Sequence, residues 1–98
     1  VIIEDLISTG GSSVKAAQAV ERETGIKVSD IFAIVSWELA ASVKTFLEAG
    51  IGLTTLTGFT EIMEEAVRSA AITSDQMIKI RSFKEDPSTW ASREGISL

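Results

Sequence analysis

The residues best suited to chemistry lie in the first twelve positions, where an acidic pair precedes a loop of small and hydroxyl-bearing residues. Glu4 and Asp5 follow three apolar residues, and residues 8–12 read Ser-Thr-Gly-Gly-Ser. Such a loop before a helix can turn backbone N–H groups and the helix dipole towards an anion. Ionised carboxylates only accept hydrogen bonds, so the acidic pair suits the paired hydroxyls of a ribose. The pattern predicts a site for a phosphorylated sugar.

Each residue of the loop has a candidate role in holding a phosphate group. Gly10 and Gly11 lack a Cβ atom, which permits a positive φ and close approach of the backbone to a ligand. The hydroxyls of Ser8, Thr9 and Ser12 add further donors. The loop holds no Lys or Arg, and it is neither a Walker loop nor GxGxxG. Thr-Gly-Gly-Ser alone is more typical of an ordinary turn, whereas the whole twelve-residue segment favours phosphate binding.

The two carboxylates of the acidic pair are not equivalent. Successive side chains of a strand point to opposite faces, so Glu4 and Asp5 would point in different directions. Besides binding hydroxyls, either acid could attract Mg²⁺ or stabilise positive charge that develops on a sugar carbon. Their individual roles stay open at the level of the sequence.

The elements that must position these residues alternate between strand and helix. The run Ile31–Val35 is continuously apolar, as expected for a central parallel strand buried on both faces. The expected strands are the opening residues, 31–35 and 53–56. The expected helices are 13–24, 39–49 and 60–71, and Gly25 and Gly50 end the first two. A fourth helix follows the capping box of Thr73 and Gln76, and a short terminal turn contains Trp90. This order, β-α-β-α-β-α-α, predicts a parallel sheet with helices on its faces and a ligand site at the carboxyl ends of the strands.

Apolar periodicity predicts which side of each helix is buried. Side chains expected to face the core are Val14, Ala17 and Val20, then Leu39, Val43, Phe46 and Leu47, and finally Met77, Ile80 and Phe83. Asp86 and Pro87 predict another helix start, with Asp as the cap and Pro at the first helical position. Trp37 and Glu38 come directly after the second strand, at the predicted ligand edge.

Composition narrows the class of protein. The chain has 98 residues, which is enough for one small domain. Its net charge of −5 argues against broad binding to nucleic acid or an anionic membrane, and the absence of Cys and His excludes thiolate and imidazole metal ligands. No apolar run approaches the roughly 20 residues that span a bilayer, and the lack of Cys fits a reducing cytoplasm. The missing initiator Met and the start within a strand suggest a segment of a longer protein.

Three segments of the chain resemble a known family. The opening residues resemble the phosphoribosyl pyrophosphate (PRPP) motif of type I phosphoribosyltransferases, which comprises an apolar strand, two acids and a Thr-Gly-Gly loop. Within that group, residues 3–12, 32–39 and 83–90 are most similar to orotate phosphoribosyltransferase. The resemblance implies an α/β, parallel-sheet, Rossmann-like type I phosphoribosyltransferase fold that is incomplete at its N-terminus. Residues 1–98 would form the C-terminal part of a single phosphoribosyltransferase domain, starting in the PRPP-motif strand.

The resemblance also implies a reaction and a set of site residues. Orotate and PRPP would give orotidine 5′-monophosphate and pyrophosphate, with Mg²⁺ as cofactor, in pyrimidine (UMP) synthesis. Glu4 and Asp5 would bind the ribose of PRPP, and Ser8 would lie near the orotate. The implied 5′-phosphate site comprises Ser8, Thr9, Gly10, Gly11 and Ser12. The resemblance implies no catalytic residue and no direct metal ligand within this segment.

The family further implies a homodimer, in which a lysine-bearing flexible loop of the neighbouring subunit completes the active site. That loop is not recognisable in these 98 residues, so we expect the chain to be inactive by itself. A cytoplasmic enzyme without nucleic-acid or membrane partners is expected. A strand such as Ile31–Val35 requires neighbours on both sides, so we also expect the chain to associate or to depend on a further segment.

Three alternatives stay open. One is a non-catalytic regulatory module that binds PRPP or a nucleotide, and another is a type I phosphoribosyltransferase for another base. The third is a purely structural α/β fragment. Ser8 argues against the 6-oxopurine branch, where an acid commonly stands at this position. Trp37 stands near the place where some family members put an Arg on the orotate, but packing at a strand exit explains it at least as well.

Overall fold

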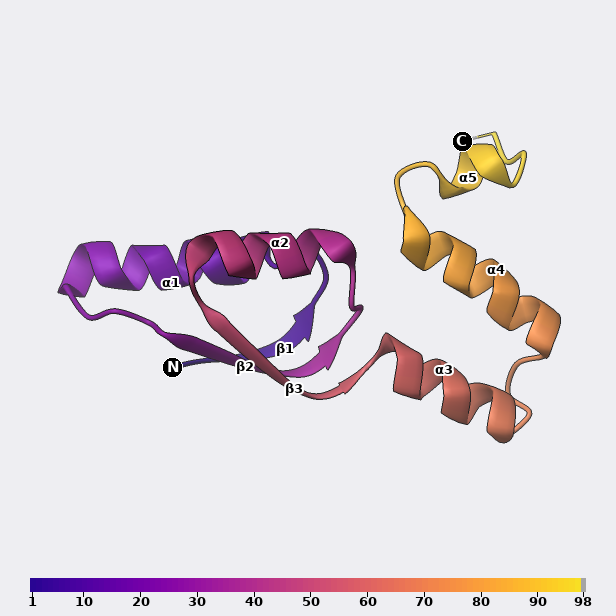
Figure 1. Cartoon of the computed structure of the whole chain (residues 1–98), viewed down its shortest axis with the longest axis horizontal. Coiled ribbons are helices and arrows are strands. Elements are labelled where there is room, and N and C mark those ends of the chain that lie inside the picture. The colour runs from indigo at the N-terminus through magenta and orange to yellow at the C-terminus, as the bar shows by residue number, and fades with distance from the viewer. Residues whose placement is uncertain (98) are drawn as a thin grey trace. The chain divides into compact units, whose positions relative to one another are not determined.

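A computed structural model describes residues 1–97, and these form three strands and five helices in the expected order. The elements are β1 (Ile2–Ile7), α1 (Gly11–Thr24), β2 (Asp30–Ser36), α2 (Ala40–Ala49), β3 (Gly52–Gly58), α3 (Phe59–Arg68), α4 (Ser74–Glu85) and α5 (Trp90–Arg93) (Figure 1). The chain divides into two compact units, of which the first is Val1–Thr60 and the second begins at Glu61. Among the described residues, no helix is both long and apolar enough to cross a membrane.

The sheet of the first unit is parallel, with the strand order β1-β2-β3. Ile31 of β2 pairs with Ile2 of β1 on one side and with Leu53 of β3 on the other. The prediction of a parallel sheet with 31–35 as its central strand is confirmed. Helices α1 and α2 lie on the same side of the sheet (Figure 1). Two right-handed crossovers that step in the same direction along a sheet put their helices on the same face, which explains this layout.

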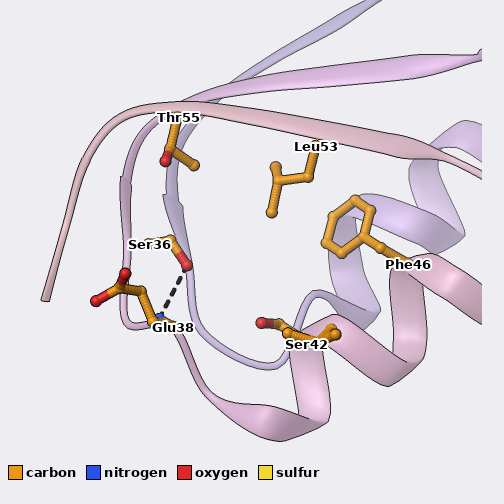
Figure 2. A pocket seen from close by; sticks show the side chains of 7 residues that line it. Ser36, Glu38, Ser42, Phe46, Leu53 and Thr55 are labelled. Atoms are coloured by element: carbon orange, nitrogen blue, oxygen red, sulfur yellow. Dashed lines mark hydrogen bonds between the residues drawn. The ribbon is translucent and has the colours of Figure 1, made fainter. Parts of the chain in front are cut away.

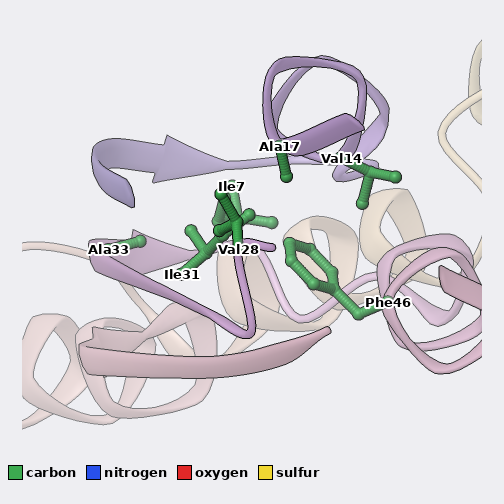
Figure 3. Packing of buried hydrophobic residues seen from close by; sticks show 7 residues of the cluster. All are labelled: Ile7, Val14, Ala17, Val28, Ile31, Ala33 and Phe46. Atoms are coloured by element: carbon green, nitrogen blue, oxygen red, sulfur yellow. The ribbon is translucent and has the colours of Figure 1, made fainter. Parts of the chain in front are cut away.

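The core of the first unit lies between the sheet and these two helices, and Phe46 of α2 packs into its centre (Figure 3). Alternate residues of β2 point inward, so Ile31 is fully buried and Ala33 is 5% exposed. Ile7, at the end of β1, is also buried in this cluster. The buried cluster comprises Ile7, Val14, Ala17, Val28, Ile31, Ala33 and Phe46.

Within the first unit the opposite face of the sheet is uncovered, so the expectation that 31–35 is buried on both faces is wrong there. Phe32 and Ile34 of β2 are 45% and 53% exposed, and Ile3 of β1 is 73% exposed. The continuous apolar run indicates a strand built for two covered faces, whereas the two crossover helices can cover only one. The opening strand is likewise only half buried, since its alternate residues are exposed.

The predicted helical faces are confirmed only in part. Val14 and Ala17 are buried as expected, but Val20 is 37% exposed because it lies beyond the end of the core. In α2 the stripe narrows to Phe46, while Val43 and Leu47 are 65% and 80% exposed. A helix with one neighbouring surface buries a single stripe, and flanking apolar residues stay exposed.

The two glycine helix ends are predicted correctly, whereas some other bounds differ by a few residues. Gly25 and Gly50 end α1 and α2 in the left-handed conformation, with φ of 73° and 66°. The first helix begins at Gly11, slightly earlier than expected, and β3 is longer than the predicted 53–56. Helix α3 ends at Arg68 instead of residue 71, and Ala70 follows with a φ of 61°.

In the second unit the capping box of α4 is confirmed. The Thr73 hydroxyl accepts from the Gln76 N–H at 3.1 Å, and the Gln76 side chain accepts from the Thr73 N–H at 2.9 Å. The residues expected to face inward from α4 (Met77, Ile80 and Phe83) are half-buried. The ring of Phe83 meets that of Trp90 edge to face at 5.8 Å, and the Trp90 indole N–H donates to the Lys79 carbonyl at 3.2 Å.

The predicted helix start at Asp86 and Pro87 is wrong, since α5 begins at Trp90. Asp86 instead stabilises the turn before it, because its carboxylate accepts hydrogen bonds from Ser88 and from the Thr89 hydroxyl. These hydroxyls hold the pKa of the Asp86 carboxyl below its ordinary value. Asp is favoured in tight turns and at helix caps for the same reason, so the sequence alone does not separate the two.

Candidate functional site

The exits of β1 and β2 lie side by side at the carboxyl edge of the sheet. The Trp37 N–H donates to the Ile7 carbonyl at 2.9 Å, which joins the turn after β2 to the last residue of β1. Ile7 is followed directly by Ser8, the first residue of the predicted anion loop. The loop therefore stands at the edge where parallel α/β sheets bind their ligands.

The loop leads into α1 with its helix N-terminus left open. Gly10 is the cap residue, with φ of 84°, and no side chain accepts a hydrogen bond at this cap. The first N–H groups of a helix have no partner within the helix, and the dipole makes this end attractive to anions. No acidic residue stands in the first turn of α1 to compete with a bound anion. This end of the helix is chemically suited to a phosphate group.

The structure requires glycine at only one of the two glycine positions of the loop. A Cβ on Gly10 would lie 2.6 Å from Cε2 of Phe46, so packing and a positive φ both require glycine there. Gly11 has no positive φ, and a Cβ there would meet nothing closer than the Thr9 hydroxyl, at 3.8 Å. Among the described residues, nothing requires glycine at position 11. A ligand that approaches the backbone closely would require it.

The hydroxyl groups of the loop are available to a ligand. Ser8, Thr9 and Ser12 are exposed, and within residues 1–97 none of their hydroxyls takes part in a hydrogen bond. Ser13 is instead 2% exposed, turned into the protein by the helix. Their role as donors to a phosphate stays a prediction.

The acidic pair precedes the loop on β1, with its two members in different surroundings. Glu4 is half-buried and pairs in register with Ala33, whereas Asp5 is exposed and its carboxylate accepts from the Leu6 N–H at 2.7 Å. In the part of the chain that the structure describes, no cluster of three or more acidic residues could hold a metal ion. Two carboxylates can contribute to Mg²⁺ binding where substrate phosphates supply further ligands.

A second polar group of residues lies at the same edge; the sequence placed Glu38 there but did not predict a cavity. Ser36, Glu38 and Ser42 line a cavity of about 260 Å³ together with Val43, Phe46, Leu53 and Thr55 (Figure 2). Ser36 and Ser42 are 6% and 2% exposed. Phe46 lines this cavity and also lies beneath Gly10. The one signal for this edge in the sequence was the position of Trp37 and Glu38 directly after the second strand.

Several known proteins are similar in sequence to this chain. The orotate phosphoribosyltransferase of Cutibacterium acnes is 44% identical to it over 91 residues, which cover 93% of this chain and 42% of that protein. That of Levilactobacillus brevis is 46% identical over 92 residues, which cover 94% of this chain and 43% of that protein. The chain is homologous to orotate phosphoribosyltransferases.

The structural comparison agrees with this relationship. A solved structure of UMP synthase from Leishmania donovani matches 84% of this chain, with a TM-score of 0.68 and 32% sequence identity, over 18% of its own length. The chain thus has the α/β phosphoribosyltransferase fold, and it matches the C-terminal part of its orotate phosphoribosyltransferase relatives. It spans less than half the length of the curated relatives that it matches. No protein-family model matches the chain.

Proposed function

We propose that the chain contributes the PRPP-binding half of an orotate phosphoribosyltransferase active site. The observation that carries this proposal is the open N-terminus of α1 behind the acidic pair of β1, in a chain homologous to these enzymes. The reaction would transfer ribose 5-phosphate from PRPP to orotate and give orotidine 5′-monophosphate and pyrophosphate. It would serve pyrimidine synthesis.

In this proposal the loop holds the 5′-phosphate of PRPP. The backbone N–H groups from Thr9 to Ser12 and the hydroxyls of Ser8, Thr9 and Ser12 would donate to its oxygens. Gly11 would allow the phosphate to approach the backbone, which the space above that residue supports. Ser8, nearest to the end of β1, would also lie beside the orotate.

Glu4 and Asp5 would accept hydrogen bonds from the ribose hydroxyls. Because one carboxylate is half-buried and the other exposed, the two would make different contacts. Negative charge beside the ribose would also stabilise the positive charge that develops on the ribosyl carbon as its bond to pyrophosphate breaks. Because Glu4 and Asp5 differ in exposure and lie next to each other on a strand, they would not hold Mg²⁺ as a pair. Either carboxylate could attract an ion that the substrate phosphates bind, and such an ion would supply positive charge for the departing pyrophosphate.

The remaining parts of the active site would come from outside this chain. We propose that residues 1–98 are the C-terminal part of a single phosphoribosyltransferase domain, which works in the cytoplasm as a homodimer with shared active sites. The relatives' additional length supports a contribution from further residues. By itself the 98-residue chain is expected to bind PRPP without turning it over.

Calorimetric titration of the chain with PRPP and Mg²⁺ tests the proposal. Saturable binding that ribose 5-phosphate competes away, and that Gly11→Ala weakens, is expected. Competition with orotate, uracil and adenine in the presence of PRPP then identifies the base. No heat and no shift of the loop amide resonances on adding PRPP would reject the proposal. Near-normal turnover by the chain alone would show that residues outside the chain are not needed to complete the active site.

A further inference from the structure

Glu38 holds a backbone conformation that residues with a Cβ rarely adopt. It follows the end of β2 with a φ of 56°. Its N–H donates to the Ser36 hydroxyl at 2.9 Å, and its carboxylate accepts from the Thr60 N–H at 2.7 Å. Glu38 therefore ties the end of β2 to the first turn of α3.

Gly58, the last residue of β3, leaves the room that this carboxylate needs. A Cβ on Gly58 would lie 2.8 Å from Cδ of Glu38, closer than such atoms approach, and 3.0 Å from Oε2, so the carboxylate would have to move. The φ of Gly58 is not positive, so its backbone does not require glycine. The carboxylate of Glu38, held beside Gly58 by the Thr60 N–H, explains the glycine instead.

The turn that Glu38 holds is also joined to the anion loop. Trp37 donates its N–H to the Ile7 carbonyl at 2.9 Å, one residue before Ser8. On its other side, the Trp37 ring lies 5.6 Å from the ring of Phe59, at 32°. The turn after β2 thus contacts the exits of both β1 and β3.

We propose that Glu38 is a positioning residue: its carboxylate fixes the turn after β2 and, through the hydrogen bond between Trp37 and Ile7, sets where the Ser8–Ser12 loop begins. Glu38 touches no substrate in this scheme. This proposal can be tested with and without a ligand. A test by PRPP binding rests on the proposed function, because PRPP is taken as the ligand of the loop. A test by the structure of the ligand-free loop does not depend on the proposed function.

The amino end of the sheet offers a matched control. Asp30 and Gly52 pair in register there, as Ser36 and Gly58 do at the carboxyl end. A Cβ on Gly52 would lie 2.5 Å from Oδ1 of Asp30, so Gly52→Ala also displaces an acidic side chain. It does so at the edge away from the loop.

The experiment compares Glu38→Ala, Glu38→Gln and Gly58→Ala with Gly52→Ala in the 98-residue chain. Amide resonances of residues 7–12 are recorded without ligand, PRPP affinity is measured by calorimetry, and urea unfolding of each variant monitors stability. Glu38→Ala and Gly58→Ala are expected to shift the loop resonances and to weaken PRPP binding about threefold to tenfold, as for directly coupled neighbours. Glu38→Gln retains an acceptor for the Thr60 N–H, so its loop resonances and its PRPP affinity should stay close to those of the original chain.

The outcomes separate the two proposals. If the unaltered chain does not bind PRPP, the proposed function fails, and the ligand-free resonances alone decide the role of Glu38. If the chain binds PRPP but Glu38→Ala leaves affinity and loop resonances unchanged, the positioning role is wrong. It is also wrong if Gly52→Ala has the same effect on the loop as Gly58→Ala, because the change would then reflect general loss of stability.

Discussion

Replacing each glycine of the loop by alanine should separate folding from binding. Gly10→Ala is expected to destabilise the first unit, whereas Gly11→Ala is expected to raise its stability slightly and to weaken PRPP binding. The two positions are adjacent and receive the same added methyl group. Their different outcomes therefore depend only on the local geometry.

The cost at Gly10 has two parts. An alanine with the φ of 84° found there costs about 1–2 kcal/mol, because its Cβ crowds the following carbonyl oxygen. The methyl group would also lie 2.6 Å from a ring carbon of Phe46, which is 5% exposed in the core. Overpacking of this kind costs about 1–3 kcal/mol. The sum of about 2–5 kcal/mol is a large share of the roughly 5–15 kcal/mol that stabilises a typical domain.

At Gly11 the added methyl group meets only the Thr9 hydroxyl, at 3.8 Å, and the φ is not positive. Position 11 is the first residue of α1, and alanine there should stabilise the helix by about 0.5–1 kcal/mol. The methyl group would keep a phosphate from the backbone N–H groups. Loss of one hydrogen bond to a charged group, worth about 1.5–3 kcal/mol, predicts roughly tenfold weaker binding or more.

Urea unfolding followed by circular dichroism measures the first effect, and calorimetric titration with PRPP measures the second. Phe46→Leu in the Gly10→Ala background should recover part of the lost stability, since the smaller side chain relieves the overlap. A Gly10→Ala chain as stable as the original would refute the packing argument. Unchanged PRPP affinity in Gly11→Ala would refute the role of the backbone in phosphate binding.

Three further predictions concern the rest of the chain. Thr73→Ala removes the capping box of α4 and should lower helix stability by about 1 kcal/mol, measured by thermal unfolding. The lowered pKa of Asp86, due to Ser88 and Thr89, stabilises the fold at pH values above the ordinary value of 3.8, and this contribution is lost as the pH falls through the lower folded-state pKa. Acid titration followed by circular dichroism should therefore show a smaller loss of helix for Asp86→Asn than for the original chain. Ile34→Lys, on the uncovered sheet face, should reduce self-association in light scattering at little cost in stability; unchanged association would show that this face is not responsible.

Local signals predicted the elements well because each depends on short-range physics. Gly25 and Gly50 end their helices since glycine adopts a positive φ without a steric penalty. The Thr73–Gln76 capping box forms since its partners are three residues apart. Asp86 shows the limit of such signals, because a carboxylate next to Pro87 satisfies a turn as readily as a helix start.

Burial was predicted less well because it depends on what lies against each surface. The run Ile31–Val35 indicates two covered faces, but both crossover helices lie on one side, so Phe32 and Ile34 are exposed. Val43 and Leu47 are exposed for the same reason, since α1 and β3 cover only part of the surface of α2. Periodicity predicts which residues share a face, and it does not reveal whether another element covers that face.

For the candidate site, the sequence alone determined the chemistry: an acidic pair, three hydroxyls and two glycines in a short loop after a strand, with no cation among them. These properties follow from residue types and from contacts between near neighbours. Tertiary structure alone separated Gly10, which packs on Phe46, from Gly11, where an added Cβ would make only an ordinary contact with the Thr9 hydroxyl. It alone also joined Glu38 to Gly58, because this contact links the exits of two strands. A side chain from another element decides how much room a glycine leaves, and only the folded chain brings that element near.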